Sequence, residues 1–489
     1  MGRFGIGFNN QGFFTTYPTV FSNVDATALN FMNQGPTGIL AILAQGAGFF
    51  PPKVPTSLPF DVGDPSRFIT ASDLLVAAKF AVKPFPQLGR SPAQIFVVPV
   101  TPATASTKKI VSVTPADLVT FTSLGWGTKF NGITVAHDAS LKKVTFVLPL
   151  TGGRNLTEVY VYTTMADLVA QVNGRSTLCT AVLNLEGTGV TYAAAAMTGG
   201  TEPAAVAADW TDSIAALATL RVNIIHLATA DTTVMAAAQA YISNHRARLF
   251  TGSATTRNWN GASNRASAIT AIKAEIAAIN DIRVMHVGIG ADGYAGYLSS
   301  ARHAALASCL EPSVPMTQKQ LGFASLEARL DLYTEVGGVD GLLLAGCAPP
   351  VPDPNSPSTF IVSRGLSTWS GDDNLYNREH SVLAAVDGIR DTLEDQLQGY
   401  LGGEGTPGVL GRIRERVESI LREAKKPTSA IRINDYDPDS IVVTFTSDTV
   451  ARVTCKITPI PPINFIAVTL NLQRTDITIT TDVNLSQAA

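Results

Sequence analysis

The sequence predicts an α/β protein of several domains with strand-like arms at its two ends. Three observations carry this prediction. Strand and helix patterns alternate through the middle of the 489 residues, a β-rich block interrupts the first half, and alternating apolar residues occupy both termini. At about three times a typical domain length, the chain can form about two to four domains that share a large buried surface.

Composition narrows the classes of function. Charged residues make up 15% of the chain, below the roughly 25% usual for soluble domains, so we expect much of the surface to be covered by other protein. A net charge of -3 without a long Lys/Arg tract gives no sign of a nucleic-acid partner. The longest apolar run, residues 38–50, is too short and glycine-rich to span a bilayer, and no signal peptide is visible. We therefore expect no membrane insertion.

The four cysteines lie far apart and form no C-x-x-C pair. Neither a zinc site nor a disulfide framework is indicated, and a reducing cytoplasm is the expected place of synthesis.

The first two hundred residues contain two kinds of structure. Residues 21–100 predict a mixed α/β part, with a helix near Ser72 to Val82 and a strand over residues 94–100. A linker rich in Pro, Thr, Ser and Lys then leads into strand patterns on either side of GWGTKFNG. We interpret residues 101–196 as an inserted β-rich domain.

Residues 197–358 predict a βαβ middle domain. Apolar strands at 222–228, 247–252 and 281–288 are separated by helices. One helix carries a stripe of isoleucines at spacings of three and four, namely Ile269, Ile272, Ile276 and Ile279. This alternation predicts a mainly parallel sheet.

Residues 359–472 predict an α/β closing domain. Two helices, over 382–400 and 409–421, each carry one apolar face, and three strands follow them. The acidic segment DYDPD, residues 435–439, predicts a proline turn between strands and lacks the full pattern of an EF-hand loop.

The chain ends in a strand whose alternation suggests an arm that docks on a neighbour. Its repeated positions are Ile477, Ile479, Thr481, Val483 and Leu485, and the N-terminus has a shorter version at Phe4, Ile6 and Phe8. We interpret residues 1–20 and 473–489 as arms, with an acceptor strand that carries Ile466, Val468 and Leu470.

The energetics of an arm favour order only in the docked state. Fixing about eight residues costs roughly 1–2 kcal/mol each in backbone entropy. Burying four apolar side chains returns roughly 1.5–3 kcal/mol each, and each ladder hydrogen bond made on docking adds about 1 kcal/mol net. The alternative is that each terminal strand pairs within its own chain.

One motif suggests a cofactor. GIGADG, residues 288–293, matches G-x-G-x-x-G after a strand and before a helix, which is the context of a dinucleotide site. The first acidic residue at a useful distance, Glu311, sits beside Pro312 at a helix end instead of at a strand tip. A tight strand-to-helix turn is therefore the preferred explanation of the glycines, and a nucleotide-dependent oxidoreductase is kept as the competing function.

No other pattern predicts chemistry. The six histidines lack metal-ligand spacing, and His226 and His286, inside apolar strands, are predicted to be hydrogen-bonded core residues. No G-x-S-x-G elbow or Walker loop occurs. The sequence therefore predicts no catalytic residue, no cofactor and no metal.

The second helix of the closing domain, residues 410–426, carries a basic face. Arg412, Arg416 and Lys426 lie among further basic residues and three glutamates. A solvated face with internal ion pairs and a docking face for another protein explain this pattern equally well.

Six segments in order resemble the contractile tail sheath family of bacteriophages and related injection machines. YPTVFSNVDAT (17–27) is similar to an opening strand of form P-G-V-Y-x-x-E, with Thr19 in place of glycine and no acidic residue. GWGTKFNGITVAHD (125–138) resembles the W-G-N segment, and MTGGTEPAAVAADW (197–210) resembles the L-x-G-G-x-D-G linker. MHVGIGADGYAG (285–296) is similar to the V-A-G-x-x-A-x-x-D turn. IVSRGLSTW (361–369) resembles the G-A-R-T-L segment, and PIPPINFIAVTLNL (459–472) resembles the P-x-x-P-A-E-F-I strand.

The resemblance implies a structural subunit. Sheath proteins polymerise helically around an inner tube, join neighbours through exchanged arm strands, and contract from a metastable extended state to drive the tube through a cell envelope. It implies that residues 359–472 face the tube, and that residues 21–100 pack with them. The implied partners are identical subunits, the tube, baseplate and terminator proteins, and the implied location is a virion tail assembled in the host cytoplasm. A bacterial contractile injection system is the alternative setting.

Overall fold

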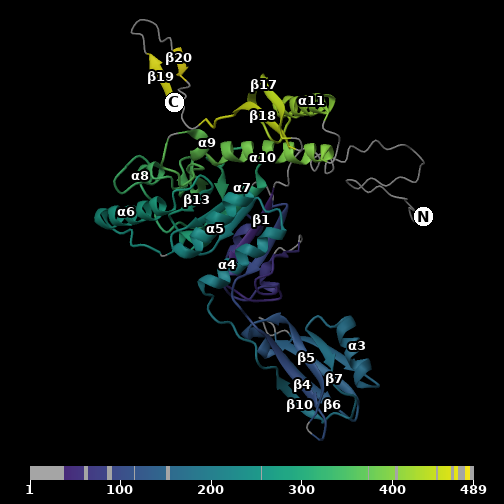
Figure 1. Cartoon of the computed structure of the whole chain (residues 1–489). Helices are drawn as coiled ribbons and strands as arrows, with labels where there is room; N and C mark the ends of the chain where they lie inside the picture. The colour runs from purple at the N-terminus through teal and green to yellow at the C-terminus, as the bar shows by residue number, and fades with distance from the viewer. Residues whose placement is uncertain are drawn as a thin grey trace, which may run out of the picture. The chain divides into compact units, whose positions relative to one another are not determined.

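A computed structural model describes residues 38–59, 64–84, 91–114, 116–149, 155–254, 256–372, 374–401, 406–447, 450–463, 467–471 and 480–484. The chain divides into two compact units. The larger contains Gly38–Leu310 and Val314–Ser381 together with the C-terminal strands, and the smaller contains Glu311–Ser313 and Val382–Pro461. Helices and several distinct sheets make up the mixed α/β fold that the sequence predicts (Figure 1).

A six-stranded sheet is the centre of the larger unit. Its neighbouring strands run parallel except for the last, which is antiparallel to its neighbour. In spatial order they are β13 (Val284–Val287), β12 (Arg248–Gly252), β11 (Ile224–Leu227), β1 (Ile39–Ala44), β3 (Gln94–Pro99) and β2 (Thr56–Ser57). The predicted parallel sheet is present, and β1 from the first part of the chain lies inside it.

Strand β1 is buried on both faces because helices cover both sides of the sheet. Leu40 and Ile42 point into one core, while Ala41 and Leu43 point into the other, and all four are 0% exposed. This run of apolar residues is typical of a central parallel strand.

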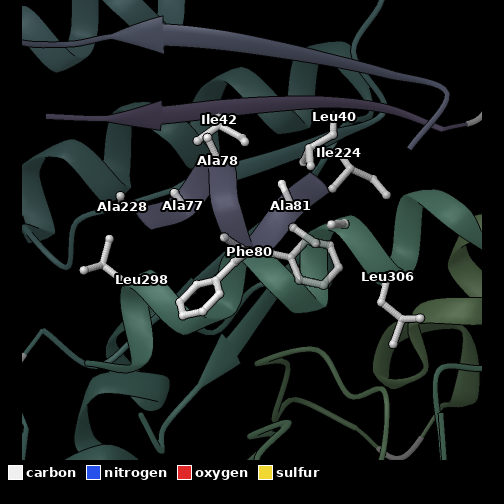
Figure 2. Close-up of a cluster of buried hydrophobic side chains, with 14 of the residues drawn as sticks. Leu40, Ile42, Ala77, Ala78, Phe80, Ala81, Ile224, Ala228, Leu298 and Leu306 are labelled. Carbon is white, nitrogen blue, oxygen red and sulfur yellow. The ribbon is translucent and has the colours of Figure 1, made fainter. Parts of the chain in front are cut away.

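Helices α2 (Asp73–Val82) and α7 (Gly296–Cys309) cover the first face. Figure 2 shows small side chains of α2 against β1, with Phe80 directed toward α7. Ser72 caps α2, because its Oγ accepts the Leu75 N–H at 3.4 Å. Almost every residue of α7 is buried, which explains its small residues and its lack of an amphipathic stripe.

The opposite face is covered by α4 (Ala207–Ala216) and α5 (Thr232–His245), whose apolar residues join Leu43 and Leu227 in a second core. Helix α6 (Ala262–Ile279) connects β12 to β13 and buries the predicted stripe at Ile269, Ile272 and Ile276.

Smaller elements complete the larger unit. A three-stranded antiparallel sheet has the order β14 (Gln320–Leu321), β16 (Ser356–Val362) and β15 (Pro350–Asp353). Short helices occur at α8 (Val339–Leu344), α9 (Leu375–Arg378), η1 (Pro65–Arg67), η2 (Thr128–Gly132) and η3 (Leu217–Thr219).

The β-rich segment contains two sheets and one helix, α3 (Met165–Arg175). The four-stranded sheet has the order β10 (Tyr192–Ala196), β6 (Thr134–Asp138), β7 (Lys143–Pro149) and β8 (Asn155–Val161). The three-stranded sheet has the order β4 (Ala105–Val111), β5 (Asp117–Trp126) and β9 (Cys179–Leu183). An edge-to-face contact of Phe121 and Phe146, with ring centroids 5.0 Å apart, lies in the shared core.

Helix α3 occupies the outer edge of β9. The Asn173 amide donates to the Ala181 carbonyl at 2.9 Å and accepts the Ala181 N–H at 2.8 Å. A side chain thus makes both bonds that an added strand would make at this residue.

The two connections of the β-rich segment are held together at its base. The Thr104 N–H donates to the Thr201 carbonyl at 3.1 Å, and the Thr104 hydroxyl donates to the Gly199 carbonyl at 2.7 Å. The Asn131 amide brackets Gly200, with both bonds at 2.9 Å. Entry and exit of the chain are therefore adjacent.

The smaller unit packs helices on a hairpin. Its elements are α10 (His380–Leu397), which begins at the end of the larger unit, η4 (Gln398–Tyr400), α11 (Pro407–Ala424), β17 (Ile433–Ser447) and β18 (Val450–Pro459). Along β18, Val453, Cys455 and Ile457 are half-buried against the helices, whereas the intervening residues are exposed. This alternation is the period of a strand with one buried face.

The predicted proline turn at residues 435–439 is not a turn between strands. Strand β17 continues through it, and its register with β18 shifts between Asp437 and Val442. A bulge accommodates Pro438, which lacks an N–H for the ladder, and the Ser440 hydroxyl donates to the Asp437 carbonyl at 2.6 Å.

We expect Gly252→Ala to destabilise the larger unit. A Cβ at this position would lie 2.3 Å from the Val287 carbonyl oxygen and 2.5 Å from the Gly296 carbonyl carbon. Backbone atoms cannot yield cheaply, so the free energy of unfolding should fall by roughly 1–3 kcal/mol, measured by urea denaturation. Gly174→Ala is the control, because its Cβ meets open space within α3. An equal loss in both variants would contradict the packing argument.

Candidate assembly surfaces

The C-terminal strands form an antiparallel hairpin of β19 (Ala467–Asn471) and β20 (Thr480–Asn484). Val468 lies opposite Val483, and Leu470 lies opposite Thr481. The structure thus shows the terminal strand paired within its own chain, which the sequence left open as an alternative to exchange. Within the part of the chain that the structure describes, this hairpin has no third strand, and a two-stranded hairpin alone is only marginally stable in water.

Several predicted arm residues cannot be placed. The following lie outside the described residues: Phe4, Ile6, Phe8, Ile466, Ile477, Ile479 and Leu485.

The β17–β18 hairpin is a second incomplete sheet. Among the described residues, no third strand pairs with either strand of this hairpin. One face is covered by α10 and α11, so a strand added at an edge would continue an apolar face that is already half-buried. Sequence analysis predicted both strands of this hairpin but placed the acceptor only at residues 466–470, because alternation alone does not show whether a strand lacks a neighbour.

Helix α11 separates an apolar face from a charged one. Ile413, Val417 and Leu421 are buried against Ile389 of α10 and Ile441 of β17. The Arg414 Nε also donates to the Ile441 carbonyl at 3.1 Å, which satisfies a backbone acceptor beside the bulge.

The three predicted docking cations are all exposed. Arg416 bonds the Gln396 side chain of α10, and Lys426, two residues beyond the end of α11, pairs with Glu423. Exposed ion pairs contribute about 0–1 kcal/mol, so their side chains can change partners at little cost. Both interpretations of this face remain open.

The GIGADG loop is a packed connection. The Gly290 N–H donates to the Glu327 carboxylate at 2.9 Å, and the Asp292 carboxylate accepts two further backbone N–H groups at 2.8 Å. Asp292 and Gly293 have φ of 55° and 81°, as in a tight two-residue turn. A dinucleotide site needs N–H groups free for phosphate, whereas in this loop the N–H groups of Gly290, Ala291 and Asp292 already donate to protein oxygens.

The histidines predicted to lie in the core do so. His226 is 0% exposed, and its Nε2 lies 2.8 Å from the Tyr297 carbonyl oxygen. Burial lowers the pKa of His226 to about 4, so the ring is neutral at pH 7 and donates this bond. His286 is 2% exposed beside Glu275.

The described residues contain neither a metal-binding cluster nor a membrane-spanning helix. No group of three His, Cys, Asp or Glu side chains there is arranged to hold a metal ion. None of the helices in this part of the chain has the length and apolar character needed to cross a membrane.

Comparison with known proteins finds similarity in structure only. No family model and no curated sequence matches the chain. The sheath tail protein from Listeria innocua superposes with a TM-score of 0.63 at 13% identity, covering 94% of this chain and 98% of its own. The sheath tail protein from Desulfitobacterium hafniense superposes with a TM-score of 0.60 at 16% identity, covering 87% of this chain and 94% of its own. A chain of the anti-feeding prophage baseplate superposes with a TM-score of 0.52 at 10% identity, covering 94% of this chain and 100% of its own.

The chain therefore has the fold of sheath tail proteins along nearly its whole length. The resemblance predicted from six short segments is confirmed at the level of fold.

We expect Leu421→Ala to loosen the smaller unit selectively. Leu421 is fully buried between α11 and the β17–β18 hairpin, and loss of such a side chain costs roughly 2–5 kcal/mol. Amide hydrogen exchange should accelerate in β17 and stay unchanged in β1. Ser419→Ala, exposed on the same helix, is the control and should change stability by less than about 0.5 kcal/mol. Unchanged exchange in β17 would show that α11 does not support the hairpin.

Proposed function

We propose that this chain is the structural subunit of a contractile tail sheath. The observation that carries the proposal is the match to two sheath tail proteins over 87% and 94% of this chain. A match of that extent includes both compact units as well as the β-rich segment. The packed GIGADG loop gives the competing oxidoreductase no support.

In this proposal the subunits polymerise helically through exchanged strands. The exchanged strand is the C-terminal arm at residues 473–489. The proposed acceptors are the strand that carries Ile466, Val468 and Leu470 and, in addition, the β17–β18 hairpin, which has no third strand among the described residues. Strand addition at a sheet edge gains main-chain hydrogen bonds worth about 1 kcal/mol each. A donor at one end and an acceptor elsewhere form a heterologous contact, which builds an open helix when its rotation does not close into a ring.

The remaining partners follow from the sheath role. The polymer surrounds an inner tube, ends at baseplate and terminator proteins, and contracts from an extended, metastable state to drive the tube through the host envelope. The likeness to a baseplate chain of the anti-feeding prophage makes an injection system the second candidate setting beside a bacteriophage virion assembled in the host cytoplasm.

Negative-stain electron microscopy of the purified chain tests the role directly. Long hollow tubes with regular striation are the expected result. Dispersed particles at high concentration, both alone and with the tube protein and baseplate as template, would overturn the proposal.

Removal of residues 475–489 should leave a folded monomer that cannot polymerise. The truncation deletes β20 and with it the strand that the proposal assigns to exchange. Sedimentation velocity and microscopy measure assembly, and circular dichroism checks folding. Removal of residues 487–489 is the matched control, which keeps β20 and should still form tubes. Normal tubes from the longer truncation would refute strand exchange through this arm.

Reversing the charges of Arg412, Arg416 and Lys426 to Glu should weaken tube docking more than sheath self-association. The three side chains are exposed, so their attraction to a partner is screened by salt and the defect should grow as ionic strength falls. Co-sedimentation with the tube and tube-free polymerisation are the two measurements. Reversal at Lys79, Lys129 and Arg175, also exposed, controls for net charge. Equal losses in both assays would argue against a tube-facing helix.

A further inference from the structure

The sequence contains three Asn-Gly pairs, at 131–132, 173–174 and 260–261, and the structure describes all of them. In such a pair the backbone nitrogen of the glycine can attack the side-chain carbonyl carbon of the asparagine, because glycine has no Cβ to obstruct the approach. A Cβ at each of these glycines would meet open space. The room around the glycine therefore does not distinguish the pairs, whereas the hydrogen bonds of the asparagine do.

Two of the asparagine side chains are held in structural hydrogen bonds. The Asn131 amide bonds both backbone groups of Gly200 at 2.9 Å each, and its oxygen also accepts the Ser106 hydroxyl at 2.8 Å. The Asn173 amide bonds both backbone groups of Ala181 at 2.9 and 2.8 Å. Neither side chain can turn toward the following glycine without breaking these bonds.

The side chain of Asn260 carries no such restraint. Asn260 is exposed, and its side-chain amide makes no hydrogen bond within the described part of the chain. Only its backbone is engaged, because its N–H donates to the Asn258 Oδ1 at 3.0 Å and its carbonyl accepts the Asn264 amide at 2.7 Å. The side chain can therefore rotate toward the Gly261 nitrogen without losing a contact.

The attacking nitrogen differs between the pairs in the same way. Gly132 belongs to η2 and Gly174 to the last turn of α3, and the N–H groups of a helix donate to carbonyls of the preceding turn. Gly261 precedes α6 with a φ of 84°, and none of the described residues accepts its N–H. The first N–H groups at a helix start have no partner within the helix, so the Gly261 nitrogen is available to react.

The loop that carries this pair is fixed on both sides. Trp259 is 8% exposed in a core with Ile269 and Ile272 of α6, and Arg257 pairs with Glu275 of the same helix. A covalent change at residues 260–261 is therefore expected to stay at the exposed tip of the loop and to leave α6 packed.

We propose that Asn260 is a site of spontaneous deamidation. The Gly261 nitrogen forms a bond to the Asn260 Cγ, the bond from Cγ to the amide nitrogen breaks, and ammonia leaves with the proton of the Gly261 nitrogen. The product is a succinimide ring. Water then adds to either ring carbonyl, and the ring opens to aspartate or isoaspartate. Water is the only co-reactant.

The modification changes the charge of the chain. A carboxylate replaces a neutral amide, which adds one negative charge to a formal net charge of -3. The new charge lies beside the N-terminus of α6, where the helix dipole favours an anion. Charge therefore accumulates with the age of the chain while the fold is kept. The inference concerns the single chain and holds whether or not the chain forms a sheath.

Peptide mass spectrometry of the full-length folded chain, aged in mildly alkaline buffer, tests the proposal. We expect Asn260 to deamidate at least about tenfold faster than Asn131 and Asn173, because those two side chains must first give up hydrogen bonds. Isoaspartate should accompany aspartate, since the ring opens at either carbonyl, and the rate should rise with pH because the attacking nitrogen must lose its proton.

The chain unfolded in urea is the control for local sequence. Without hydrogen bonds and helices, the Asn-Gly pairs should deamidate at similar rates. Equal rates for the pairs in the folded chain would overturn the proposal, and so would aspartate alone at Asn260, which indicates direct hydrolysis without a ring.

A substitution tests the charge consequence. Aged parent chain should show an additional, more acidic band on isoelectric focusing, and Asn260→Gln should lack this band because glutamine would need a larger ring. Asn244→Gln, exposed on α5, is the matched control and should keep the band. Circular dichroism should be the same for both variants and the parent. An acidic band of undiminished intensity in aged Asn260→Gln would place the modification elsewhere and overturn the proposal.

Discussion

Burial of β1 on both faces is the constraint on which the larger unit depends. Leu40 and Ile42 require α2 and α7 on one side, while Ala41 and Leu43 require α4 and α5 on the other. The parallel partners β3 and β11 come from opposite sides of the β-rich segment in the sequence. Since β3 precedes the β-rich segment and β11 follows it, the sheet can be completed only after that segment has been synthesised.

Local patterns predicted local structure well. The helices and strands between residues 222 and 310 follow from apolar periodicity, as does the buried stripe of α6. The central position of β1 could not be predicted, because a six-residue apolar run carries no information about partners more than 180 positions away. Pro438 was misjudged for a related reason, since an edge strand with a bulge tolerates proline where a central strand does not.

The assembly surfaces and the contacts between distant elements show a second limit of sequence reasoning. Incomplete sheets are visible only once every strand has been assigned a partner, so the β17–β18 hairpin could not be recognised as open from its alternation. The pairing of Glu275 with His286 joins α6 to β13 and follows no motif spacing. The basic face of α11 was predictable residue by residue, because helical periodicity alone separates Arg412 from Val417.

The adjoining connections at Thr104 and Thr201 make the β-rich segment a detachable module. Because entry and exit lie side by side, changes within residues 105–200 need not shift the register of the six-stranded sheet. They would, however, remove the Phe49–Phe130 ring contact and the hydrogen bond from Trp126 to Gly48. Such a junction is a natural site for recombination in evolution. It is equally a site where a foreign domain could be grafted in the laboratory.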